Sequence, residues 1–128
     1  MMMAQCTVPK RPTNDYLEEI TKLLERVRPK LAAEHRLELK RVFGAVGGYV
    51  NGNIFISCGK FGIALRLPPK ILDRLFREID VAPLRYFAKG HIKKQYAVIP
   101  QRLLKDKREF GKLLDESISF LGLHQTNR

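Results

Sequence analysis

The chain of 128 residues carries 24 lysines and arginines against 13 aspartates and glutamates, a formal net charge of +11. Its hydrophobic fraction of 45% excludes a disordered chain, and no apolar run approaches the roughly 20 residues that a membrane-spanning helix needs. This length suits a single domain. We expect a flexible leader over residues 1–12, one domain over 13–123 and a polar tail over 124–128.

The first expected element is a helix over about residues 15–33. Apolar side chains recur there at helical spacing, at Leu17, Ile20, Leu24, Val27 and Leu31. Pro29 should kink or end the regular helix near Arg28, because proline cannot donate to the preceding turn. The last turn is therefore expected to be irregular.

A four-stranded antiparallel meander follows between Leu37 and Leu67, where apolar residues alternate with polar ones. Asn51-Gly52 is typical of a type I′ hairpin turn, because both residues tolerate positive φ. The glycines between Gly44 and Gly48 match neither phosphate-loop nor dinucleotide-binding spacing. They predict a turn or bulge.

The second half alternates helices with a further strand. Pro68-Pro69 opens a helix, and Val81 to Pro83 ends it. Its expected apolar stripe consists of Ile71, Leu72, Leu75, Phe76 and Ile79. We expect an extended or looped segment over Leu84–Gly90 and a strand over Ile92–Ile99. The last helix carries Phe110, Leu113, Leu114, Ile118 and Leu121 and should end at Gly122.

These elements predict an α+β fold: an antiparallel meander with helices packed on one face, in the order α-β-β-β-β-α-β-(β)-α. No motif in the sequence indicates a catalytic or metal-binding site. The histidines, His35, His91 and His124, lie in separate segments without metal-ligand spacing. Cys6 and Cys58 are expected to be free thiols, with Cys58 filling the core, which fits a cytoplasmic protein. We predict no enzymatic activity, no cofactor and no metal.

The segment from Arg85 to Lys112 holds 9 basic and 2 acidic residues and interleaves cations with aromatic residues. Its candidate binding residues are Arg85, Lys89, Lys93, Lys94, Arg102, Lys105, Lys107, Arg108 and Lys112. Three interpretations stay open: a solvated rim, a nucleic-acid contact or the site of an acidic protein partner. No helix-turn-helix pattern supports base-specific recognition.

The order of these motifs resembles that of a known family. The run from Lys40 to Tyr49, followed by Asn51-Gly52-Asn53-Ile54-Phe55, looks like the N-terminal domain of TfoX/Sxy competence regulators. The segments Pro83–Tyr86 and Tyr96–Pro100 and the closing helix are also similar, so the resemblance spans about Tyr16 to Leu121.

This resemblance implies a fold like that of secretion chaperones, and a non-enzymatic regulatory or interaction module of bacteria. Family proteins with both domains promote competence-gene transcription alongside the cyclic-AMP receptor protein, so a protein partner in transcription regulation is expected. The alternative is a basic protein that binds nucleic acid through Arg85–Lys112. No membrane partner is expected, and self-association through an exposed sheet edge stays open.

Overall fold

The computed structural model describes residues 15–42, 44–85 and 92–126, with side chains as far as Leu121. One sheet of six strands, each antiparallel to its neighbours, has the order β2-β3-β4-β5-β7-β6. The strands are β2 (Leu37–Val42), β3 (Ala45–Val50), β4 (Asn53–Gly59), β5 (Gly62–Arg66), β6 (Ala82–Arg85) and β7 (Ile92–Ile99). The helices are α1 (Tyr16–Val27), α2 (Leu31–Glu34), α3 (Pro69–Leu75), α4 (Gln101–Leu104) and α5 (Lys107–Thr126).

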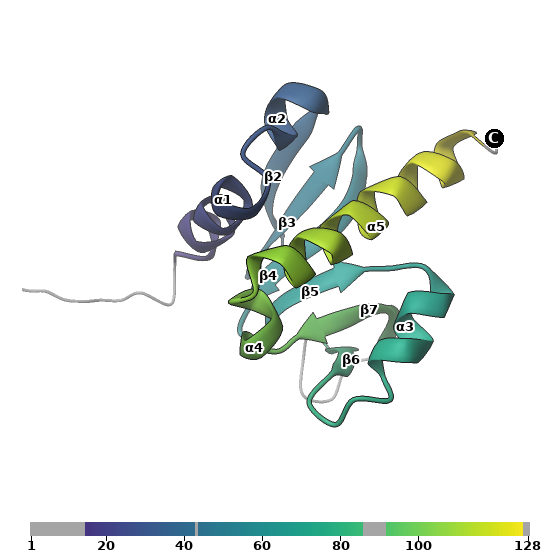
Figure 1. Cartoon of the computed structure of the whole chain (residues 1–128). Helices are drawn as coiled ribbons and strands as arrows, with labels where there is room; N and C mark the ends of the chain where they lie inside the picture. The colour runs from purple at the N-terminus through teal and green to yellow at the C-terminus, as the bar shows by residue number, and fades with distance from the viewer. Residues whose placement is uncertain (1–14, 43, 86–91, 127–128) are drawn as a thin grey trace, which may run out of the picture.

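Helices and sheet form two layers, and the long helix α5 crosses the sheet beside α1 (Figure 1). Both helices contact β4 as well as each other, so they cover the same face. This confirms the predicted α+β fold. No helix among the described residues is long and apolar enough to cross a membrane.

The predicted meander is confirmed as β2 to β5. At its central hairpin, Asn51 and Gly52 have φ of 52° and 87°, the positive values that a type I′ turn requires. The pairing of β3 with β4 shifts register between Gly48 and Tyr49, so the glycine-rich run forms a strand with a bulge. A Cβ added at Gly48 would lie 2.5 Å from Cγ2 of Ile56. The glycine therefore permits close packing and belongs to no phosphate loop.

The strand predicted over Ile92–Ile99 is confirmed as β7, which pairs with β5 on one side and β6 on the other. No helix continues through Val81 to Pro83, as the sequence predicts, and β6 already begins at Ala82. Proline is tolerated there since β6 is the edge strand of the sheet and its register shifts between Pro83 and Leu84. The segment Leu84–Gly90 was expected to be extended or looped, and Leu84 and Arg85 are extended in β6. Residues 86–90 lie outside the described residues.

Three helix boundaries differ from the prediction. The first regular helix ends at Val27 with Arg28 as its C-cap, as predicted from Pro29. The continuation to residue 33 is wrong, because α2 forms as a separate helix after Pro29. Helix α3 ends at Leu75, so Ile79 lies outside it. The expectation that Ile79 belongs to the buried apolar stripe is wrong: the Ile79 side chain is fully exposed, and Val81 is buried instead. The last helix continues past Gly122 to Thr126, because glycine in a helix interior costs only about 1 kcal/mol.

One hydrophobic core joins both layers. Ile20 and Leu24 of α1 and Phe110 and Leu114 of α5 are buried together with strand residues of the sheet. Cys58 on β4 belongs to this core and has no exposed surface, as the sequence predicts. The apolar stripes of α1 and α5 are therefore buried in this core.

A buried hydroxyl links α5 to the sheet. Ser117 has no exposed surface, and its Oγ donates to the backbone carbonyl of Arg66 at the end of β5. We expect Ser117→Ala to lower the free energy of unfolding by about 1–2 kcal/mol, because it removes a buried hydrogen bond. Urea denaturation would measure this change. Ser119→Ala, an exposed substitution of the same kind on the same helix, should stay within about 0.5 kcal/mol. Equal effects of the two substitutions would contradict this account.

Candidate functional site

The basic residues predicted between Arg85 and Lys112 fall into two groups at opposite ends of β7. Arg85, Lys93 and Lys94 lie at the start of β7 and on its neighbour β6, where they are exposed. Arg102, Lys105, Lys107, Arg108 and Lys112 follow the other end, on or beside α4 and at the start of α5. A strand rises about 3.3 Å per residue, so β7 separates the groups by about 23 Å. Lys89 lies outside the described residues.

Arg102 is engaged by acidic side chains from the turn before β6. Its Nε donates to Oδ2 of Asp80 at 2.7 Å, and its guanidinium also contacts Oδ1 of Asp80 and the carboxylate of Glu78. Hydrogen bonds from Arg102 lower the pKa of Asp80, and those carboxylates raise the pKa of Arg102. Arg102, a predicted binding residue, therefore holds α4 against the turn before β6. Asp80 and Glu78 offset its positive charge, so little of that charge is available to a ligand.

Lys105, Lys107 and Arg108 are exposed, and none of them has an ion-pair partner within the described part of the chain. Arg26 on α1 joins them, because its guanidinium donates to the carbonyl of Leu104 at 2.8 Å. We call Arg26, Lys105, Lys107 and Arg108 the α4–α5 cation surface. Lys112 lies one turn further along α5 and pairs with Glu109 at 3.6 Å.

A shallow hollow of about 270 Å³ connects α1 to this surface. Lys22, Arg26 and Lys105 line it, and Glu19 contributes a negative charge. Lys22 and Arg26 are four residues apart on the exposed side of α1, which is a visible sequence signal. Lys22 and Arg26 are not among the predicted binding residues, because each has acidic neighbours on the same helix. Lys22 indeed pairs with Glu18 at 3.1 Å, whereas Arg26 points toward α4.

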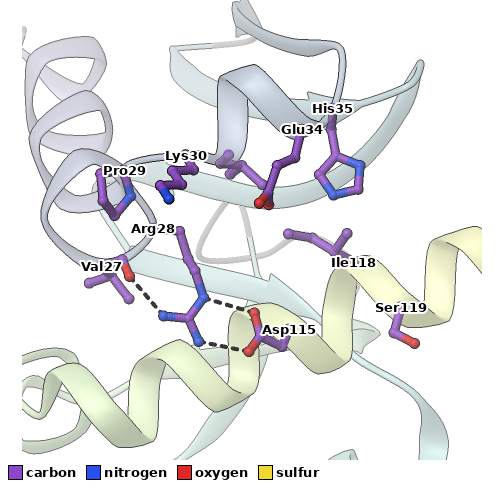
Figure 2. Close-up of a pocket in the computed structure, with 10 residues that line it drawn as sticks. Val27, Arg28, Pro29, Lys30, Glu34, His35, Asp115, Ile118 and Ser119 are labelled. Atoms are coloured by element: carbon purple, nitrogen blue, oxygen red, sulfur yellow. Dashed lines mark hydrogen bonds and ion pairs between the residues drawn. The ribbon is translucent and has the colours of Figure 1, made fainter.

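A larger hollow of about 520 Å³ lies where α1 breaks before α2 and faces α5 (Figure 2). Arg28 forms a bidentate ion pair with Asp115, at 2.8 and 2.7 Å, and donates to the carbonyl of Val27 at 2.8 Å. Asp115 raises the pKa of Arg28 through this hydrogen bonding. A Cβ at Gly111 would lie 2.7 Å from the guanidinium, so the glycine makes room for it.

The ion pair in this hollow has a structural role. The Arg28–Asp115 pair holds the break after α1 against α5, as Figure 2 shows. His35 lines the same hollow without an accompanying cysteine, and Glu34 and Asp115 do not complete a ligand set with it. Over residues 15–42, 44–85 and 92–126, no group of three His, Cys, Asp or Glu side chains could hold a metal ion.

A third hollow, of about 440 Å³, is formed by α3, α5 and the adjoining ends of β5 and β7. Arg66 and Lys94 line it beside apolar side chains. Lys94 was selected from the sequence, but Arg66 was missed because the alternating sequence around it predicts an exposed side chain, whereas Arg66 is half-buried and its Nε is buried. The described part of the chain thus offers two cationic regions, one at each end of β7.

A comparison of the sequence with protein-family models identifies its family. The model of the TfoX N-terminal domain matches residues 30–121. The chain belongs to the TfoX N-terminal domain family. A search of curated proteins finds no match to it.

The matched residues of this TfoX N-terminal domain run from the break after α1 through all six strands and nearly all of α5. They include Lys105, Lys107 and Arg108, and also the whole lining of the hollow beside α3. Arg26 on α1 and Arg28 just after it lie before the match. The α4–α5 cation surface is therefore built mainly by the family domain, with one contribution from α1.

Proposed function

We propose that this chain is a non-enzymatic regulatory module of bacterial transcription, which works in the cytoplasm by binding another protein. The observation that carries the proposal is the family match over residues 30–121, which covers the complete sheet. The domain is similar to the first domain of competence regulators, so a role beside the transcription machinery follows from the family. An interaction role also agrees with the net charge of +11, which favours acidic partners.

The α4–α5 cation surface is the region that we assign to the partner. Lys105, Lys107 and Arg108 are exposed and have no ion-pair partner in the described segments, so their charges are available to a ligand. Complementary charges across an interface increase the association rate and fix the register of the partners. A carboxylate-rich surface of a protein would satisfy these cations.

The proposal is tested with purified cyclic-AMP receptor protein, the partner that the family resemblance implies. We expect saturable binding in a fluorescence anisotropy titration. The double charge reversal Lys105→Glu/Arg108→Glu should weaken this binding by about tenfold or more, since unlike charges become like charges. The matched control is Lys93→Glu/Lys94→Glu, which changes the net charge equally at the other end of β7 and should alter the affinity by less than about twofold.

Equal weakening by both double variants would show that net charge alone, and not this surface, governs binding. An absence of binding by the unmodified chain would remove the cyclic-AMP receptor protein as the partner. Substrate turnover by the purified chain would overturn the non-enzymatic assignment itself.

The second candidate function is direct binding of nucleic acid, which Lys105, Lys107 and Arg108 favour because none of them has an ion-pair partner in the described segments. The same variants separate the two candidates when duplex DNA replaces the protein probe. If the chain binds the phosphates of DNA, its affinity should fall steeply as the salt concentration rises. The variant Lys105→Glu/Arg108→Glu should then bind every DNA sequence more weakly. Tight, salt-sensitive DNA binding without protein binding would make this candidate the preferred function.

A further inference from the structure

The hollow beside α3 has the dimensions and lining of a small-molecule site. Its volume of about 440 Å³ lies in the range typical of ligand pockets. Leu67, Leu72, Phe76 and Phe120 contribute apolar lining from the end of β5, from α3 and its C-terminal cap, and from α5. Two of these residues are aromatic, so the wall suits a flat apolar group.

Arg66 lines this wall, and it forms no ion pair among the described residues. Its Nε is buried and has no hydrogen-bond partner in the same part of the chain. Because Nε has no accessible surface, a ligand in the hollow would bind Arg66 through the terminal nitrogens of the guanidinium. Lys94 lines the same hollow from β7, where it is exposed and forms no ion pair within the described segments.

Among the described lining residues Asp73 is the one acidic side chain, and it forms no ion pair with Arg66 or Lys94. Two cations and one anion leave the hollow with a formal charge of +1. A ligand with one negative charge would balance it. A carboxylate suits the planar guanidinium of Arg66, which can offer two parallel donors.

We propose that this hollow binds a small carboxylic acid with an aromatic body. The carboxylate lies against Arg66 and Lys94, and the ring packs between Phe76 and Phe120. A phosphate dianion fits less well, because Asp73 opposes a second negative charge. Pro69 at the start of α3 also offers no backbone N–H to a phosphate. The hollow lies beside α3 and the α4–α5 cation surface lies beside α4. These two helices flank opposite ends of β7 (Figure 1), so this inference does not depend on the proposed protein partner.

The test is an NMR titration of the whole chain with phenylacetate and 3-phenylpropionate, each compared with its neutral amide. We expect the acids to shift the amide resonances of Leu67, Leu72 and Lys94 and to saturate with a Kd of about 1 mM, as a ligand of this size allows. The amides should bind about tenfold or more weakly, because they lose the charge-assisted hydrogen bond.

Arg66→Gln removes the charge and should weaken the binding of both acids by about tenfold or more. The control Arg41→Gln removes an exposed cation from β2 and should change the Kd by less than about twofold. Should Arg66→Gln not fold, Lys94→Gln provides a second variant at an exposed position, with an expected weakening of about threefold.

Equal affinity for acid and amide would overturn the proposal, because the hollow would then be only an apolar pocket. Failure of both acids to shift these resonances at about tenfold above the expected Kd would also overturn it. A peptide that ends in phenylalanine presents the same carboxylate and aromatic ring, so it serves as a further probe for binding of a protein C-terminus. If the peptide shifts these resonances and the free acids do not, the ligand is a protein C-terminus and not a small molecule.

Discussion

Phe110→Ala is expected to lower the free energy of unfolding by about 3–5 kcal/mol, the range typical of a buried phenylalanine cut to alanine. Phe110 has no exposed surface and lies in the first turn of α5, within the core shared by α1 and the sheet. Truncation removes apolar contacts from both layers and leaves a cavity that packed neighbours fill only in part. Urea denaturation followed by circular dichroism would measure the loss.

The position of Phe110 explains why this residue should matter so much. Asp106 caps the helix, because its Oδ1 accepts from the backbone N–H of Glu109 at 3.1 Å. The cap fixes where α5 begins and therefore which side chain enters the core at its first turn. Ile79→Ala provides the control, since Ile79 is fully exposed and its truncation should change stability by less than about 0.5 kcal/mol. A loss below about 1 kcal/mol for Phe110→Ala would mean that α5 does not anchor the core.

The regular elements of the fold could be predicted because each follows from a local pattern. Alternation between Leu37 and Leu67 specified the meander, and Asn51-Gly52 specified its central turn. The helix ends were less predictable, because they depend on contacts far along the chain. Arg102, for example, binds Glu78 and Asp80 in the turn after α3, where the sequence still predicted a helix.

The candidate site was predictable only as a set of charges. The sequence places Lys94 and Lys105 in one basic segment, whereas the extended backbone of β7 carries them toward opposite ends of the sheet. Arg28 and Asp115 meet across 87 residues, and Arg66 shares a hollow with Phe120. No periodicity reveals such pairs, because they depend on how α1, α3 and α5 cross the sheet.

Cys58 is expected to react with a thiol reagent at least about a thousandfold more slowly in the folded chain than after unfolding in urea. Burial, together with the smaller effect of the neighbouring Glu19 carboxylate, raises the pKa of the Cys58 thiol to about 12. The reactive thiolate is therefore rare at neutral pH, and the absence of exposed surface also excludes the reagent. Measurements in a Cys6→Ser background isolate Cys58, and labelling as fast as in urea would contradict its burial.

The same pKa shift makes stability depend on alkaline pH. The folded chain holds the Cys58 proton more tightly than the unfolded chain, whose thiol has its ordinary pKa near 9.0. This contribution is complete below that value and is lost as the pH rises toward about 12, by about 1.4 kcal/mol per pH unit. Lysine and tyrosine titrate in the same range, so the quantity to measure is the stability difference between Cys6→Ser and Cys6→Ser/Cys58→Ala. That difference should change between about pH 9 and pH 11 to the disadvantage of the chain that keeps Cys58. A difference independent of pH would show that solvent reaches Cys58 and that α1 does not seal this part of the sheet.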